Sequence, residues 1–174
     1  MSARPSVTVR LEPMGEEDYQ RSLERGIPYY ANQLAERGLC LKERALEVST
    51  SDFKELLPQG LKTPNRHLLN VVDQTTGDHV GEAWYTLRDR GGKVEFWIDW
   101  IWVEPPYRRR GVASAVLHLL EDEARRVGAD RTGLSVWMDN PEAVALYSKL
   151  GYATHMMRMT KLLGDPAPAK SDLS

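Results

Sequence analysis

The spacing of hydrophobic and polar residues changes within the first third of the chain, from that of a strand to that of a helix. In SVTVRLE (residues 6–12) apolar and polar side chains alternate, which predicts a short strand. From residue 16 to residue 57 the apolar positions recur at helical spacing, with a break around Gly38. Two helices are therefore expected here, and Pro58 and Gly60 end the second one.

Three segments in the middle of the chain have the composition of strands. They are rich in β-branched, leucine and aromatic residues and span residues 67–73, 79–87 and 93–103. The connections QTTGD (74–78) and RDRGG (88–92) contain residues that favour tight hairpin turns. The pattern predicts three strands that pair in antiparallel fashion with their neighbours along the chain.

After these strands the spacing of the apolar residues again becomes that of a helix. Residues 111–127 carry apolar side chains at helical spacing, and Gly128 suits the C-terminal cap of that helix. The segment RTGLSVWM (131–138) then predicts another short strand. A strand, a helix and a strand in succession are typical of an α/β fold.

A last helix and a last strand are expected near the C-terminus. Asn140 is a good N-cap, Pro141 fits the first helical position, and Gly151 ends the helix. Residues 152–163 predict the final strand. The resulting order is β-α-α-β-β-β-α-β-α-β, and we interpret it as an α/β domain (α+β in the broader sense) built on a mixed central sheet.

Composition and charge limit the class of protein. A chain of 174 residues with 41% hydrophobic content suits one soluble domain, which we place at residues 1–163, followed by a disordered tail at 164–174. The single cysteine, Cys40, excludes an internal disulfide. No segment contains the roughly 20 apolar residues of a membrane span, and the N-terminus lacks the apolar core of a signal peptide. A cytoplasmic protein that does not bind membranes is therefore expected.

The stretch VEPPYRRRGVA (103–113) leads from a predicted strand into a predicted helix. The first N–H groups of a helix have no backbone partner, and the helix dipole adds partial positive charge at that end. Gly111 and Ala113 let an anion approach the backbone closely, and the arginines at 108–110 add charge. This position favours a pyrophosphate-sized ligand over a solvated basic turn.

Other ligands and partners fit this stretch less well. The net charge of -2 speaks against a nucleic-acid-binding module, which would need a broad basic face. The chain contains neither G-x-x-x-x-G-K-[ST] nor G-x-G-x-x-G, so ATP and dinucleotides lose support. The four histidines, at 67, 79, 118 and 155, show no metal-ligand spacing, and no metal is expected.

Two motifs resemble the signatures of the GNAT superfamily of N-acetyltransferases. Arg108, Gly111 and Ala113 match its [QR]-x-x-G-x-[GA] pyrophosphate loop. The segment 139–152 is similar to its second signature, N-x-x-A-x-x-x-Y-x-x-x-G-[FY], which is matched by Asn140, Ala143, Tyr147, Gly151 and Tyr152. The resemblance covers residues 67–163 most clearly. It implies a single-domain GNAT-like acyl-CoA N-acyltransferase fold with acetyl-CoA as the cosubstrate.

The resemblance also implies which residues bind acetyl-CoA. The backbone groups of Trp102 and Val103 would hydrogen-bond the pantetheine arm as though it were another strand. The remaining expected contacts come from the loop, the helix start and the second signature: Arg108, Arg109, Arg110, Gly111, Val112, Ala113, Ser114, Asn140 and Tyr147. Asn140 can cap its helix and contact the ligand at the same time.

Transfer of the acetyl group to an amine requires a base and an acid. A lysine-like amine has a pKa near 10.4, so only about one molecule in 2500 is neutral at pH 7. Tyr147 matches the family position that commonly protonates the departing thiolate, although a tyrosine on such a helix can also be a core residue. The base is expected on strand 93–103, where Asp99 is the first candidate and Glu95 the second.

In a regular strand these carboxylates share one face, which comprises Glu95, Trp97, Asp99, Ile101 and Val103. A β-bulge, which is common here in the family, would change which carboxylate faces the cleft. The alternative is that both carboxylates point to solvent. All five tryptophans (84, 97, 100, 102 and 137) lie in predicted strands, as core residues or as walls of an acceptor pocket for an aromatic or cationic amine.

The acceptor itself is left open by the sequence. Family members that acetylate ribosomal-protein N-termini carry a glutamate where this chain has Ser135, which counts against such a substrate. The leading hypothesis is N-acetylation of a primary amine in a small molecule or a peptide. A non-catalytic acyl-CoA sensor with the same fold is the alternative, and family members often form homodimers.

Overall fold

The structure is a computed structural model that describes residues 7–161 and residue 163. Two compact units, Met1–Val136 and Trp137–Ser174, make up the chain. The predicted tail at 164–174 lies outside the described residues, and the single domain at 1–163 stays a prediction. Among the described residues, no helix is both long and apolar enough to cross a bilayer.

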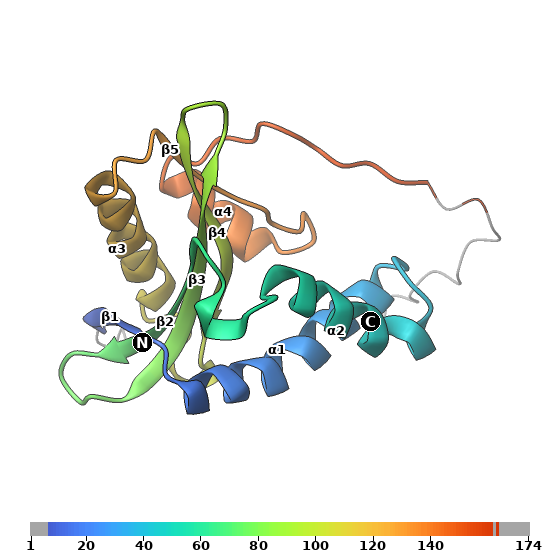
Figure 1. Ribbon diagram of the computed structural model, residues 1–174, viewed down its shortest axis with the longest axis horizontal. Coiled ribbons are helices and arrows are strands. Elements are labelled where there is room, and N and C mark those ends of the chain that lie inside the picture. Colours follow the sequence, from blue (N-terminus) through green and yellow to red (C-terminus); the bar gives the residue numbers. More distant parts are fainter. Residues whose placement is uncertain (1–6, 162, 164–174) are drawn as a thin grey trace, which may run out of the picture. The chain divides into compact units, whose positions relative to one another are not determined.

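A five-stranded sheet in the order β1-β2-β3-β4-β5 forms the centre of the first unit (Figure 1). Its strands are β1 (Val9–Pro13), β2 (Arg66–Asp73), β3 (His79–Asp89), β4 (Val94–Val103) and β5 (Arg131–Leu134). All neighbours are antiparallel except β4 and β5, which are parallel. The predicted meander and the mixed sheet are thus confirmed.

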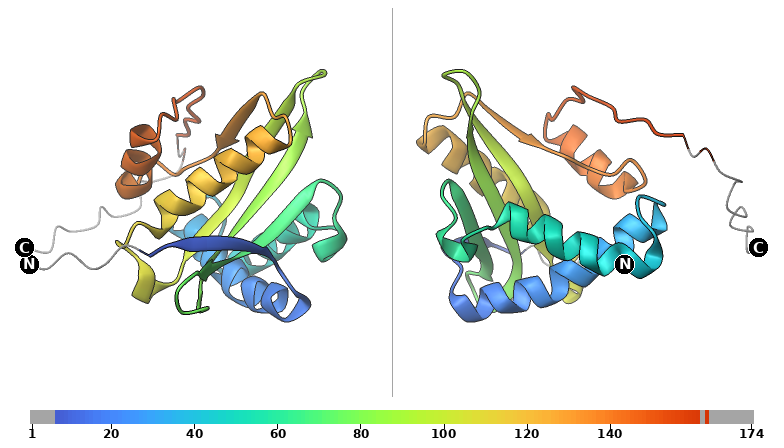
Figure 2. Two further views of the ribbon diagram at one scale, coloured as in Figure 1. Left: turned by 90° about the vertical axis from the view of Figure 1, so that its left-hand side faces the viewer. Right: turned by 45° about the vertical axis from the view of Figure 1, so that its right-hand side comes forward.

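Helices cover both faces of this sheet (Figure 2). They are α1 (Glu16–Glu36), α2 (Ala45–Leu56) and α3 (Val112–Arg126). Adjacent residues of β3 show the two faces directly. The Trp84 ring meets Phe53 of α2 at a centroid distance of 5.9 Å, while the Tyr85 hydroxyl donates to Glu123 of α3 at 3.2 Å. Alternation along a strand therefore assigns α1 and α2 to one face and α3 to the other.

An apolar cluster fills the space between α1, α2 and the sheet. Its buried members are Met14, Tyr19, Phe53, Leu57, Leu68 and Trp84. The α1 helix approaches the Phe53 ring so closely that a Cβ on Gly26 would lie 3.1 Å from it. Glycine at this position thus lets helix and ring pack together. The opposite face buries a stripe of α3 that includes Val112, Val116, Leu117 and Leu120.

The helix α4 (Pro141–Lys149) belongs to the second unit. The predicted cap is confirmed, because Asn140 Oδ1 accepts the N–H of Ala143 at 3.2 Å. The helix stops before Gly151, whose φ of 89° lies in the left-handed region. Gly128 has the same role after α3, with a φ of 71°.

Two strand predictions near the C-terminus are wrong in part or in full. β5 ends at Leu134, so Trp137 lies outside any strand. Residues 152–161 form no strand at all, and Met156 and Met159 are 86% and 85% exposed. A strand forms only where its backbone groups pair with a neighbouring strand, and these residues have no such pairing within the described sheet.

Candidate active site

β4 and β5 pair only over a short distance and then diverge. Residues 95–98 of β4 pair with Arg131–Leu134, whereas residues 99–103 have no partner on this side within the described sheet. A parallel pair that separates in this way exposes the backbone groups of one strand edge. The open edge of β4 thus begins at Asp99 and runs toward the loop at 104–111.

The hydrogen-bond alternation decides which residues face the open edge. The N–H of Glu104 donates to the carbonyl of Val80 in the β3 region at 2.9 Å. The Trp102 carbonyl packs against Gly81, where an added Cβ would lie 2.3 Å from the oxygen. In an antiparallel ladder the intervening residues point the other way. The backbone of Ile101 and Val103 therefore faces the open edge, and that of Trp102 faces β3.

A β-bulge interrupts β4 at Asp99. Trp84 pairs with Trp100 and Tyr85 with Ile98, which leaves Asp99 as the extra residue. The bulge changes the phase of the strand, so Trp100 takes the face of Trp84, and their rings lie 5.9 Å apart. The expectation of a regular strand is thus wrong for Ile101 and Val103, which are turned to the opposite face from Glu95, Trp97 and Asp99.

Asp99 is buried among polar partners on the α1/α2 face. Its side chain is 7% exposed and accepts a hydrogen bond from the Thr86 hydroxyl. Arg66 Nη1 lies 3.2 Å from Asp99 Oδ2, and Arg88 Nη2 lies 3.5 Å from Asp99 Oδ1. Burial raises the pKa of Asp99 above its usual value, while Thr86 and the two arginines oppose this shift. A carboxylate with a raised pKa is a stronger proton acceptor than a solvated one.

Glu95 is also buried but is held in ion pairs. Its side chain is 8% exposed, and its two oxygens lie 2.9 Å from Arg131 Nε and 3.3 Å from Arg90 Nε. It is located where β4 still pairs with β5, before the open edge begins. The alternative that both strand carboxylates point to solvent is therefore wrong, and only Asp99 borders the open edge.

The three arginines of the loop after β4 differ in their contacts and backbone conformation. Arg108 Nε donates to the Val103 carbonyl at 2.9 Å, and its guanidinium lies 4.8 Å from the centre of the Trp102 ring. Arg110 lies over the Tyr107 ring at 5.4 Å. Arg109 adopts a φ of 60°, an uncommon conformation for a side chain of its size and one often found at functional sites.

The start of α3 has the features of an anion site. Gly111 occupies the N-cap with a φ of 81°, and no side chain caps the helix. The first turn, Val112–Ser114, contains no acidic residue. Three N–H groups and the helix dipole therefore point into the loop without a competing carboxylate, as phosphate binding requires.

The second unit carries the two remaining predicted residues. Tyr147 lies in α4, with its ring 5.8 Å from that of Tyr152 in an edge-to-face arrangement. Burial, with a smaller contribution from Tyr152, raises the pKa of the Tyr147 phenol. A phenol with a raised pKa stays protonated at neutral pH. Asn140 is the N-cap of the same helix.

Sequence reasoning did not single out a buried polar network beside Trp100. Glu82 is 1% exposed and accepts hydrogen bonds from the Ser22 hydroxyl at 2.7 Å and from Trp100 Nε1 at 2.8 Å. Arg25 completes the network, with Nη2 2.5 Å from Glu82 and Nη1 2.8 Å from Glu104. The signal in the sequence that could have revealed this network is Glu82, a glutamate within an apolar strand. No local signal marked Thr86, Arg66 or Arg88 as partners of Asp99.

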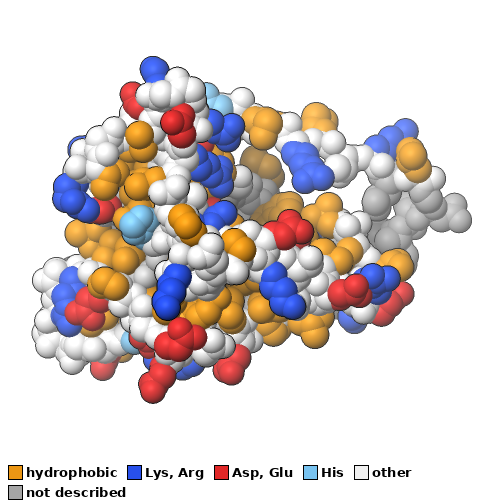
Figure 3. Space-filling view, in the orientation of Figure 1, with side chains coloured by type: hydrophobic (Ala, Val, Ile, Leu, Met, Phe, Trp, Pro, Cys, Tyr) orange, Lys and Arg blue, Asp and Glu red, His pale blue; other side chains and the backbone are white. Residues whose placement is uncertain are grey.

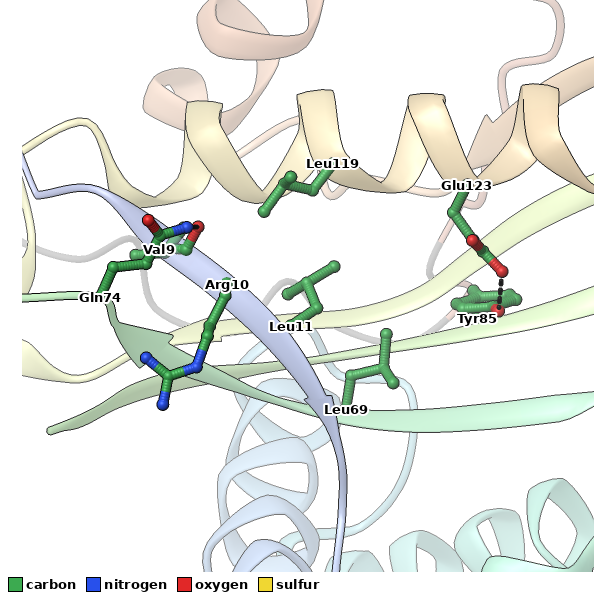
Figure 4. Close-up of a pocket in the computed structure, with 8 residues that line it drawn as sticks. All are labelled: Val9, Arg10, Leu11, Leu69, Gln74, Tyr85, Leu119 and Glu123. Atoms are coloured by element: carbon green, nitrogen blue, oxygen red, sulfur yellow. Dashed lines mark hydrogen bonds between the residues drawn. The ribbon is translucent and has the colours of Figure 1, made fainter. Parts of the chain in front are cut away.

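A cavity of about 330 Å³ lies on the other face, between β1, β2 and α3 (Figure 4). Its walls include Leu11, Leu69 and Leu119, and Tyr85 and Glu123 close one end. Burial and Glu123 raise the pKa of Tyr85 to about 12. The described residues contain no group of three metal-ligating side chains.

A family model and two named proteins match this chain. The Acetyltransferase (GNAT) family matches residues 36–152. Two Bacillus subtilis proteins named as uncharacterized N-acetyltransferases are similar in sequence: YdgE is 29% identical over 88% of this chain and 97% of its own, and YycN is 31% identical over 90% of this chain and 100% of its own.

The fold is also shared with solved structures. The crystal structure of YycN superposes with a TM-score of 0.85 at 31% identity, covering 91% of this chain and 100% of that one. A BH1408 variant from Bacillus halodurans has a TM-score of 0.69 at 16% identity, covering 88% and 99%, and supports the fold alone. A mixed five-stranded sheet with helices on both faces is the α/β fold that this chain shares with these structures. This chain belongs to the GNAT family of acetyltransferases.

Proposed function

We propose that the protein transfers the acetyl group of acetyl-CoA directly to a primary amine of a small molecule or a peptide. The observation that carries this proposal is the open edge of β4, which runs from Asp99 to Val103 and is followed by the loop that leads to the uncapped N-terminus of α3. A donor with a pyrophosphate at one end and a thioester at the other matches this edge. The edge spans four residue steps, or roughly 13 Å.

The donor is expected to bind through backbone groups more than through charge. The pyrophosphate would accept hydrogen bonds from the first N–H groups of α3, with Arg109 and Arg110 beside it. The pantetheine amides would pair with Val103 and Ile101, which face the open edge. Arg108 binds the Val103 carbonyl and would have to release it for such pairing.

The chemistry then requires one proton acceptor and one proton donor. Asp99 would remove a proton from the acceptor ammonium, and the free amine nitrogen would attack the thioester carbonyl carbon. As the tetrahedral intermediate collapses, the C–S bond breaks and the thiolate takes a proton from the Tyr147 phenol. The new amide nitrogen gives up its second proton, which returns through solvent to the Tyr147 phenolate. Glu95 is the second candidate base, although its ion pairs with Arg90 and Arg131 favour a structural role.

A thiol-release assay with acetyl-CoA over a panel of amino acids, polyamines, aminoglycosides and peptide N-termini tests the proposal. We expect thiol release that depends on both acetyl-CoA and the amine, with an acetylated product found by mass spectrometry. Acetyl-CoA binding without release over the whole panel would contradict it and would indicate an acyl-CoA sensor instead.

A further inference from the structure

Two arginines share one carboxylate at the bulge of β4. Arg66 and Arg88 contact opposite oxygens of Asp99, at 3.2 and 3.5 Å. Arg66 also donates to Thr86 at 2.6 Å, and the Arg88 guanidinium covers the Trp97 ring at 4.2 Å. The two guanidinium groups carry one more positive charge than Asp99 can neutralise.

The other carboxylates at this end of the sheet have partners of their own. Glu95 is held between Arg90 and Arg131. In the adjoining turns, Asp89 accepts the N–H of Gly92 at 2.9 Å, and Asp130 accepts the N–H of Val94 at 2.8 Å. Glu95 lies opposite Arg88 in the β3–β4 register and attracts its positive charge, but among the described residues Asp99 is the carboxylate that contacts both arginines.

Both arginines keep donors that a ligand can use. A guanidinium has five N–H donors in a planar fork, which matches the two oxygens of a carboxylate or a phosphate. The contacts of Arg66 and Arg88 within the described chain use one terminal nitrogen of each. Their side chains are 19% and 30% exposed, so they are held in place but remain accessible. Figure 3 shows Lys and Arg side chains gathered along this part of the sheet.

The position of the pair connects it to the acceptor. Asp99 is located where the open edge of β4 begins, so the thioester is expected beside it. We propose that Arg66 and Arg88 bind an oxyanion of the acceptor, so that the substrate is an amine carrying a carboxylate or phosphate group near its nitrogen. The inference rests on the proposed acetyl transfer. It pairs the substrate ammonium with Asp99 and the substrate oxyanion with the arginines.

Matched pairs of acceptors test the inference. Each pair differs only in the oxyanion: lysine and cadaverine, glycine and glycinamide, phosphoethanolamine and ethanolamine. We expect the oxyanion member to have at least about tenfold higher kcat/KM, the gain typical of one charge-assisted hydrogen bond. The first two pairs report on carboxylate and the third on phosphate. Equal or better use of every member that lacks the oxyanion overturns the inference and leaves the acetyltransferase function intact.

Substitution of the arginines separates recognition from folding. Arg88→Gln and Arg66→Gln are expected to remove the preference within a pair and to leave the KM for acetyl-CoA unchanged. A purely structural role would lower the rates of both members alike. Arg88→Lys should restore part of the preference. The control is Arg126→Gln, an exposed residue of α3 paired with Glu123, which should leave the ratio unaltered.

Absence of turnover has a separate consequence. If no member of any pair is acetylated, the proposed transferase function fails for these amines. Calorimetric titration of the same pairs into the CoA-bound protein then decides the inference. Tighter binding of the oxyanion member that is lost in Arg88→Gln supports it, and equal binding within each pair overturns it.

Discussion

The Thr86 hydroxyl donates a hydrogen bond to the Asp99 carboxylate across the β3–β4 bulge. This bond lowers the pKa of Asp99, against the larger upward effect of burial. In Thr86→Val the bond is lost, and the pKa of Asp99 should rise. If Asp99 is the base, the acid limb of the kcat/KM–pH profile moves to higher pH, because more of the carboxylate is protonated at a given pH.

Thr86→Ser is the matched control, since it keeps the hydroxyl and should keep the wild-type profile. A Thr86→Val profile that coincides with the wild type would remove Asp99 from the base role. Glu95→Gln would then be the next variant to measure.

Tyr147→Phe should reduce kcat by about 100-fold or more if the phenol protonates the thiolate, the range typical of general acid catalysis. The Kd for acetyl-CoA, measured by calorimetry, should change little because the ring remains. Tyr152→Phe removes a hydroxyl from the neighbouring ring and serves as the control. An unaltered kcat in Tyr147→Phe would assign the residue to packing only.

Gly111→Ala should weaken acetyl-CoA binding several-fold. The φ of 81° costs an alanine about 1–2 kcal/mol, and the added methyl lies where the pyrophosphate is expected to approach the α3 N-terminus. Gly128→Ala imposes similar strain at the other end of the same helix, where φ is 71°. Both variants should lose stability in urea, but only the Gly111 variant should have a raised Kd. Equal Kd values would argue against an anion site at this helix end.

Glu82→Ala should destabilise the fold by about 2–3 kcal/mol, because it removes the acceptor for the buried Ser22 hydroxyl and for Trp100 Nε1, whereas Arg25 keeps its ion pair with Glu104. Urea unfolding followed by tryptophan fluorescence measures the loss. The exposed pair Arg44–Glu47 supplies the control, and Glu47→Ala should leave the unfolding midpoint near the wild type. A midpoint for Glu82→Ala similar to that of Glu47→Ala would refute a stabilising role of the network.

Local signals predicted much of the fold. The turn residues between 67 and 103 predicted the meander, and Asn140, Pro141 and Gly128 marked helix ends that the structure confirms. These features depend on backbone preferences within a few residues, which a sequence displays directly. The loop and helix start at 108–114 could be recognised for the same reason.

Long-range pairing between strands determined the features that the sequence did not predict. The bulge at Asp99 depends on the register between β3 and β4, and it turned Ile101 and Val103 to the other face. The partners of Asp99 come from residues 66, 86 and 88, brought together by three strands. The expected final strand does not form over the described residues 152–161, because a strand needs a paired neighbour. The sequence alone thus determined the family and most of the elements in their order. Strand register determined the surroundings of the carboxylate, because no local signal encodes which distant residues meet.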